Sequence, residues 1–265
     1  MTKNAGAQLI APRESTGSCI GLCDSCGICA ERRDLLLKQE GNAASLESIV
    51  RRVVTNVLRD VEMYGVSGLK EQAGKAMIPV GVSARHVHVC QEDLEKLFGP
   101  GYTLTHDRDL LQPGEFASKE SVTLLGPEGR TIAHVRILGP LRSRTQVELA
   151  RTDGIALGIK HLPMRRSGEL AGAAPITLVG PKGALYLAEG AIRSNRHIHM
   201  GPQDAARFGV KQNDVVQLRV GGPEGVTFHN VQIRIHDTWK LVVHLDTDDA
   251  NAAGIACEVH AELIK

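Results

Sequence analysis

Short runs of apolar and polar residues, separated by glycine and proline, fill the chain from about residue 78 onward. Three of these runs enter a Gly-Pro turn and continue into another strand-like run, at residues 122–129, 176–183 and 216–225. Each predicts a β-hairpin, because glycine and proline favour the backbone angles of tight turns. Many short strands with few helices predict a mainly β fold built from small barrels or sandwiches.

A His-x-His tripeptide occurs twice in this β-rich region, at residues 86–88 and 197–199. Each copy follows an arginine and precedes a short helical pattern, at residues 92–98 and after Pro202. In a strand, residues two apart point to the same side, so both imidazoles would face one way and the apolar residue between them the other. The spacing therefore suits a metal site if the backbone is extended.

The repetition of this strand, helix and hairpin unit predicts two similar domains related by a pseudo-two-fold axis. We place the first domain at residues 78–165 and the second at residues 166–265, although strands can cross between the halves.

Residues 44–62 follow a different period. Apolar side chains recur three and four positions apart, from Leu46 to Val61, which is the stripe of an amphipathic helix. Its valines and isoleucines are mediocre helix formers, so the helix would gain stability by docking on another surface. That surface is either its own domain or another protein. The glycine-containing linker at residues 63–77 favours another protein, with this helix as a targeting element.

The first 43 residues form an extension with four closely spaced cysteines, Cys19, Cys23, Cys26 and Cys29. Such spacing allows the chain to wrap one zinc ion or an iron–sulfur cluster. The alternative is a flexible segment of redox-active thiols without a metal.

Composition narrows the class of protein. The 265 residues carry a net charge of +1 and only 3% aromatic residues, which argues against nucleic acid as a partner. No apolar run reaches the roughly 20 residues of a membrane span, and residues 1–18 lack a secretory signal. We therefore expect a cytoplasmic protein whose cysteines are thiols or metal ligands.

The two histidine pairs need further ligands, and Glu148 and His244 on strand-like stretches are the candidates. Two histidines with a carboxylate, or three histidines, leave an open position on zinc. Three arginines, Arg136, Arg142 and Arg144, surround a Gly-Pro turn near Glu148. A cation beside a metal centre favours an anionic substrate between them.

Four motifs resemble those of the PduL-type phosphate acyltransferases (phosphate propanoyltransferases) of bacterial microcompartments. They are GVSARHVH at residues 81–88, ILGPLRSRTQVE at 137–148, NRHIHM at 195–200 and HLDTDDANA at 244–252. The resemblance covers about residues 78–265. It implies two β-barrels, each capped by short helices, with a two-zinc active site between them that converts acyl-CoA and phosphate to acyl phosphate and CoA.

The resemblance also implies roles for individual residues. One zinc, which also meets the CoA sulfur, would be held by His86, His88 and Glu148, and the other by His197, His199 and His244. Arg142 matches the phosphate-binding arginine, and the positions lining the CoA site are Ser83, Arg136, Leu138 and Asn251. Cys90 stands where a serine-like helix cap is expected, and its thiol is a candidate extra ligand.

The same resemblance implies targeting by residues 44–62 to shell or cargo proteins, a location in the microcompartment lumen, and a homo-oligomer. Two other interpretations remain open. One is a di-zinc hydrolase of an anionic ester or thioester, with water as the acceptor. The other is a scaffold with structural zinc, against which the six candidate ligands and the nearby arginine argue.

Overall fold

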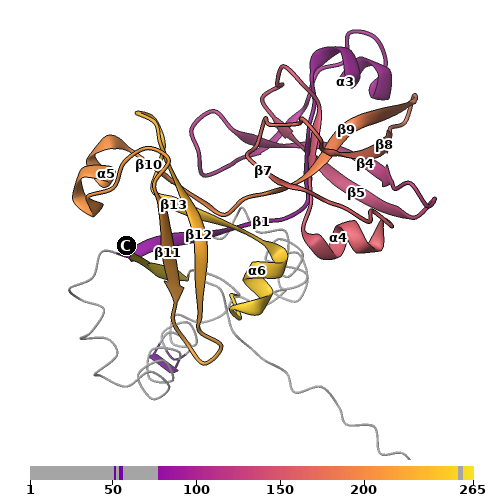
Figure 1. Cartoon of the computed structure of the whole chain (residues 1–265). Helices are drawn as coiled ribbons and strands as arrows, with labels where there is room; N and C mark the ends of the chain where they lie inside the picture. Colours follow the sequence, from indigo (N-terminus) through magenta and orange to yellow (C-terminus); the bar gives the residue numbers. More distant parts are fainter. Residues whose placement is uncertain (1–50, 52–53, 56–76, 256–258) are drawn as a thin grey trace, which may run out of the picture.

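The computed structural model of the chain describes residues 51, 54–55, 77–255 and 259–265. Figure 1 shows two lobes side by side, each built around a closed β-barrel, with short helices at their edges. This confirms the expected mainly β fold with two barrels. The cysteine cluster and nearly all of residues 44–62 lie outside the described residues.

One barrel, called here the second barrel, closes through six strands. Their order around the ring is β1 (Met77–Ser83), β13 (Val242–Asp246), β10 (His197–Met200), β12 (Val226–Ile235), β11 (Val215–Val220) and β14 (His260–Ile264).

The other barrel, called the first barrel, also closes through six strands, because β8 pairs with both β4 and β9. Their order is β9 (Ala184–Ser194), β6 (Gln146–Glu148), β2 (His86–His88), β5 (Thr131–Gly139), β4 (Phe116–Leu125) and β8 (Ala174–Val179). Two short strands extend this sheet, β3 (His106–Asp109) on β4 and β7 (Met164–Arg165) on β9.

The two rings match strand by strand, including which neighbours run parallel and which run antiparallel. In this correspondence β1 is equivalent to β9, and β2 to β10. Each repeat therefore begins with a strand that completes the barrel of the other repeat. The barrels are joined by this exchange as well as by side-chain contacts.

The expected division between residues 165 and 166 allowed strands to cross between the halves, and the strand pairing shows which ones do. Residues 174–194, which form β8 and β9, lie in the first barrel, and β1 lies in the second. The sequence alone did not identify these strands. Periodicity identifies a strand, whereas its partner can be far away in the chain, as Val80 is from Val243.

The apolar positions form one core in each barrel. Along β11, the alternate residues Val216, Leu218 and Val220 are buried, as the period of two requires. Val87 of β2 and Ile198 of β10 are both fully buried, each in the core of its own barrel. The side chains on either side of them in sequence must therefore leave that core.

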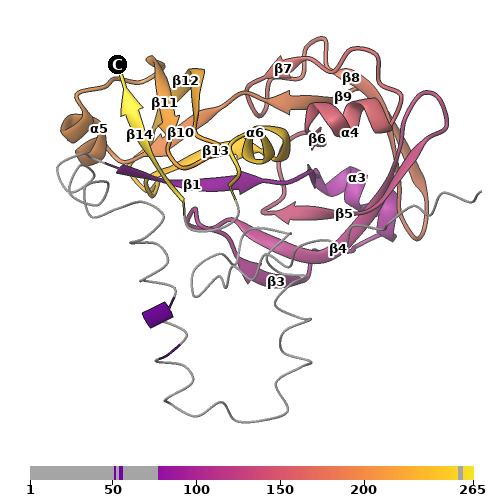
Figure 2. The same cartoon turned by 90° about the horizontal axis from the view of Figure 1, so that it is seen from below.

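Four short helices accompany the barrels: α3 (Gln91–Phe98), α4 (Arg151–Ala156), α5 (Pro202–Phe208) and α6 (Thr247–Ala252). Helices α3 and α5 confirm the two helical patterns expected after the histidine pairs. Gly99 and Gly209 end these helices at positive φ, and Pro202 opens α5. In both Figure 1 and Figure 2, α4 and α6 lie next to each other where the lobes meet. There the backbone N–H of Thr152 in α4 donates to the Asp248 carboxylate of α6 at 2.9 Å.

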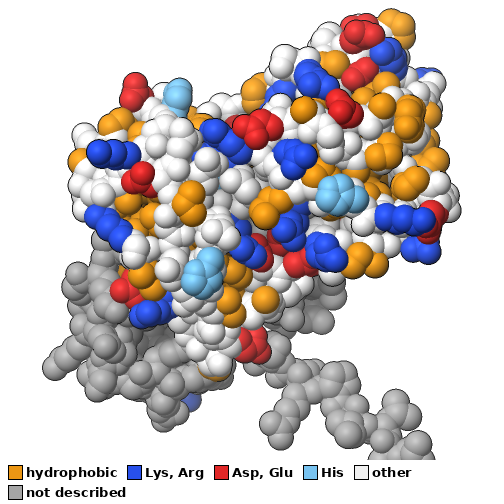
Figure 3. All heavy atoms as spheres, viewed as in Figure 1, with side chains coloured by type: hydrophobic (Ala, Val, Ile, Leu, Met, Phe, Trp, Pro, Cys, Tyr) orange, Lys and Arg blue, Asp and Glu red, His pale blue; other side chains and the backbone are white. Residues whose placement is uncertain are grey.

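The surface of the described residues carries basic and acidic side chains interspersed on the face shown in Figure 3. Such mixing agrees with the net charge of +1. Among the described helices, none is long and apolar enough to cross a membrane.

Candidate metal centre

Both His-x-His tripeptides lie on strands, and the two imidazoles of each copy face the same way. The ring centroids are 4.9 Å apart for His86 and His88, and 4.7 Å apart for His197 and His199. All four side chains are at least nine-tenths buried. Because Val87 and Ile198 fill the barrel cores, the imidazoles lie on the opposite, outer side of each barrel wall.

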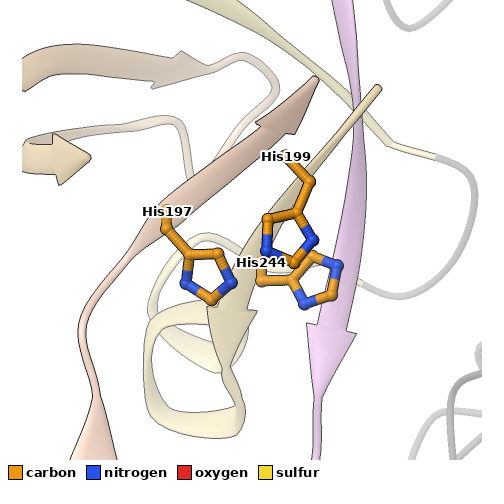
Figure 4. A group of neighbouring side chains, drawn as sticks. All are labelled: His197, His199 and His244. Atoms are coloured by element: carbon orange, nitrogen blue, oxygen red, sulfur yellow. The ribbon is translucent and has the colours of Figure 1, made fainter. Parts of the chain in front are cut away.

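The strand register supplies a third ligand to each pair. Glu148 on β6 is the direct cross-strand partner of His86, and His244 on β13 is the partner of His197. In each resulting triad, the candidate ligand atoms lie within 4.8 Å of one another. Figure 4 shows the rings of the second-barrel triad, contributed by β10 and β13, gathered around a common space. The two triads occupy equivalent positions in the two barrels.

Hydrogen bonds orient the first histidine of each pair. The Nδ1 atoms of His86 and His197 lie 2.8 and 2.7 Å from the carbonyl oxygens of Ala84 and Asn195. A carbonyl only accepts, so each Nδ1 carries the proton and donates it, which leaves Nε2 with a free lone pair.

The second histidine of each pair has no such partner at Nδ1. The Nδ1 atoms of His88 and His199 are buried without a hydrogen-bond partner among the described residues. An orphaned buried nitrogen is costly unless something coordinates it. Together with the donor sets His-His-Glu and His-His-His, these atoms fit divalent zinc or a similar first-row metal.

The protonation states also suit metal binding. Burial, followed by the charge of His244, lowers the pKa of His199 to about 3, and burial lowers the pKa of His244 to about 4. Burial alone would raise the pKa of Glu148, but the charges of His86 and His88 and a hydrogen bond from Ser167 bring it to about 2. At neutral pH these imidazoles are therefore neutral and the carboxylate is ionised, as metal ligands must be.

The triads influence each other across the barrel interface. The Glu148 charge of the first barrel raises the pKa of His199 and His244 in the second, and the His86 charge lowers that of His244. Charges act more strongly at short distances in protein, so the first triad lies close enough to influence the second.

Arg142 is tied to the first triad through a small polar network. Its Nη1 donates to the Ser167 hydroxyl at 2.7 Å, and that hydroxyl donates to Glu148 Oε1 at 2.7 Å. The Gln146 side-chain amide donates to the same carboxylate oxygen at 2.7 Å. Sequence reasoning missed Ser167 and Gln146, because no pattern distinguishes a single serine in a loop or a glutamine two residues before a ligand.

The turn that carries Arg142 depends on a glycine. A Cβ atom on Gly139 would lie 2.2 Å from the ring of Phe116, closer than any side chain allows. This close packing holds the Gly-Pro turn against β4.

An aromatic ring stacks on the second triad. Trp239 lies 4.0 Å, centroid to centroid, from His199. Gln112 of the first barrel holds the neighbouring backbone through hydrogen bonds with the N–H and C=O of Lys240, at 2.9 and 3.0 Å. Residues of both barrels thus lie on the Trp239 side of the second triad.

Comparison with known proteins identifies the family. The family model described as phosphate propanoyltransferase matches residues 79–256. This chain belongs to the phosphate propanoyltransferase family.

Individual family members agree with this assignment. The chain is 49% identical over 211 residues to a phosphate propanoyltransferase of Lachnoclostridium phytofermentans, covering 79% of this chain and 93% of that protein. It is 50% identical over 177 residues to one of Thermotoga maritima, covering 66% of this chain and 83% of that protein. One of Rhodobacter capsulatus is 49% identical over 180 residues, covering 68% and 83% of the two chains.

The positions expected to line a CoA site in this phosphate propanoyltransferase come from both barrels. Ser83, at the end of β1, is the strand-register partner of Asp246 on β13. Asn251 lies on α6, which contacts β1. Arg136 and Leu138 lie on β5 of the first barrel. Arg136 donates to the Ser118 carbonyl at 2.6 Å and pairs with Asp107 at 3.1 Å.

Cys90 of this family member precedes α3 without a side-chain capping bond and belongs to neither triad. Its backbone N–H donates to the Thr145 hydroxyl at 3.1 Å, and that hydroxyl donates to Asp93 at 2.7 Å. Arg144 and Cys90 line a surface pocket of about 350 Å³ bordered by β9. The pocket contains no triad residue.

Proposed function

We propose that the chain transfers an acyl group between CoA and phosphate at a two-zinc centre where the two barrels meet. The reaction class, phosphate propanoyltransferase, follows from the family. The observation that carries its location is the pair of complete triads, one in each barrel, with Arg142 linked through the Ser167 hydroxyl to Glu148 of the first triad.

The first zinc would be held by His86, His88 and Glu148, and the second by His197, His199 and His244. Zinc in such open sites polarises carbonyl or phosphoryl oxygens and keeps a thiol deprotonated. The residues themselves contribute imidazoles, of which His86 and His197 are oriented by a hydrogen bond at Nδ1, and one ionised carboxylate that would offset part of the positive charge.

Arg142 binds and orients phosphate in this proposal. Its guanidinium is about one-third exposed and is positioned by Ser167 at Nη1, while Nη2 lies 4.0 Å from Glu115 Oε1. The guanidinium can therefore still donate to an anion. A phosphate oxygen then attacks the thioester carbonyl carbon. The new C–O bond forms, the C–S bond breaks, and CoA leaves as a thiolate that carries the electron pair. No serine or cysteine of the chain forms a bond to the acyl group.

CoA would approach along β1, α6 and β5, where Ser83, Asn251, Arg136 and Leu138 lie. Arg136 offers a positive charge to the CoA phosphates, and Leu138 an apolar contact. These roles come from the positions of the residues and from the family motifs.

A thiol assay tests the proposal. The full-length zinc-loaded protein should release CoA from propanoyl-CoA only when phosphate is present, and acyl phosphate should accumulate in equal amount. Arg142→Met should lower kcat/KM for phosphate by about 100-fold or more, because a charged donor to the reacting anion is lost. The exposed arginine variant Arg207→Met on α5 is the control and should behave as wild type.

CoA release at the same rate without phosphate would instead identify a thioester hydrolase and contradict the transferase proposal. Undiminished phosphate use by Arg142→Met would contradict the role of that arginine.

We also propose that residues 44–62 target the enzyme to shell or cargo proteins of a bacterial microcompartment. The amphipathic period of this segment and its glycine-containing linker support the proposal. The Cys19–Cys29 cluster is proposed as an additional zinc or iron–sulfur site, on the basis of its spacing alone.

A further inference from the structure

A second arginine, Arg234, lies beside the second-barrel triad and was not singled out by the sequence. It lies on β12, where it is the register partner of His199 on the parallel strand β10. The residue is only 7% exposed. In the described part of the chain, no carboxylate lies close enough to form an ion pair with it, and its Nε has no hydrogen-bond partner.

The hydrogen bond that Arg234 does make fixes its orientation. Its Nη2 donates to the Asn195 side-chain oxygen at 2.5 Å. The Asn195 amide in turn donates to Gln232 at 3.1 Å, and its backbone N–H donates to the Arg165 carbonyl at 3.0 Å. Asn195 lies in the connection between β9 and β10. The Nη2 atom of the guanidinium is therefore anchored, whereas the buried Nε has no hydrogen-bond partner among the described residues.

Arg234 keeps its positive charge in this buried setting. Burial and the neighbouring Arg166 lower its pKa to about 10, and the charges of Glu148 and Glu169 only partly oppose them. It remains cationic at neutral pH. Arg234 in turn lowers the pKa of His197, His199 and His244. A buried cation without a paired anion is costly, so such a group is retained where an anion binds during function.

Arg142 lies beside the first triad, because its Nη1 donates to the Ser167 hydroxyl, which donates to Glu148. Arg234 lies beside the second triad, opposite His199 in the strand register. Each triad therefore has one guanidinium group next to it, contributed by its own barrel. A tetrahedral dianion offers enough oxygens to accept hydrogen bonds from both.

We propose that Arg234 is a second phosphate-binding residue, which together with Arg142 holds the phosphate substrate between the two barrels. This inference rests on the proposed function and names a further group that touches the substrate. Because Arg234 belongs to one barrel and Arg142 to the other, phosphate binding would also draw the two barrels together.

The test uses the full-length zinc-loaded protein and Arg234→Met, which removes the charge but keeps much of the volume. The variant should raise KM for inorganic phosphate by about tenfold or more, the effect of losing a hydrogen bond to a charged group. KM for propanoyl-CoA should stay unchanged. A rise confined to KM for propanoyl-CoA would assign Arg234 to the CoA phosphates and overturn the inference.

Thermal unfolding separates this role from a structural one. Without phosphate, Arg234→Met should melt at or above the wild-type temperature, since an unpaired buried cation is gone. Added inorganic phosphate should raise the wild-type melting temperature but not that of the variant. Arg207→Met should respond as wild type does.

Should Arg234→Met not fold, Arg234→Lys tests the same point with the charge retained. It should raise KM for phosphate, because an ammonium lacks the planar fork. Unchanged phosphate KM and an unchanged phosphate-induced shift in the folded variant would overturn the inference. Absence of phosphate-dependent CoA release in wild type would be a failure of the proposed function instead.

Discussion

At the scale of single residues, the two candidate sites share a scaffold and differ in charge. Glu148 and His244 occupy equivalent positions, each opposite the first histidine of its pair. A divalent metal held by three neutral imidazoles would keep its full charge, whereas Glu148 would offset one unit. In the proposed two-metal centre, the second-barrel site would therefore attract a phosphate dianion more strongly.

Ser167 connects the arginine to the carboxylate ligand, and its removal should show what that connection contributes. Ser167→Ala deletes the hydroxyl that accepts from Arg142 and donates to Glu148. Loss of such an outer partner of a metal ligand should lower kcat/KM or metal affinity by about 10–100-fold. The exposed Ser143→Ala on the neighbouring turn is the control. Equal activities in steady-state assays of the two variants would contradict the positioning role.

The sequence predicted the six candidate ligands but not the residues that support them. Period-two spacing alone places His86 and His88 on one side of a strand. By contrast, Ser167 and Arg234 reach the centre through contacts between distant segments. Only the folded barrels show that these side chains lie beside the triads.

At the scale of elements, an equivalent ion pair braces each ligand-bearing strand. Arg196, just before β10, binds Asp249 of α6 through two bonds of 2.7 Å. Arg85, just before β2, lies 2.9 Å from Asp153 of α4. Each arginine precedes a His-x-His copy, and each aspartate lies in the first turn of the helix that follows the third ligand. Through these ion pairs, α6 and α4 thus position the N-terminal ends of β10 and β2, the strands that carry the histidines.

Asp249→Asn should weaken this brace in the second barrel. The loss of a charge-assisted bidentate pair should lower the free energy of unfolding by about 1–3 kcal/mol. Denaturant unfolding of the zinc-loaded protein measures the change. The exposed Asp237→Asn, on the loop before β13, serves as the matched control. If both variants unfold at the wild-type denaturant concentration, the brace contributes nothing.

At the scale of the whole molecule, the repeats exchange their first strands. The sequence indicated the duplication, the hairpins and the helices α3 and α5, because these depend on local patterns, whereas α4 and α6 were not predicted. The exchange of β1 and β9 depends on pairing between distant strands, and local pattern carries no information about it. The exchange ties the two barrels, and with them the two triads, together.

The targeting proposal concerns a part of the molecule outside both barrels. Deletion of residues 44–62 should leave the rate of phosphate-dependent CoA release unchanged, since both triads lie beyond residue 77. The same deletion should abolish co-localisation of a fluorescently labelled enzyme with shell proteins. Unchanged localisation would mean that the segment is not a targeting element.

The central claim is that each triad binds its own metal ion, and metal content measures it most directly. Full-length wild type, His88→Ala, His199→Ala and the double variant should be purified alike and analysed for zinc per chain. Differences from wild type cancel any metal held by the cysteine cluster. Each single variant should lose one zinc ion per chain, and the double variant two. Folded variants that retain the wild-type zinc content would contradict the two-metal centre.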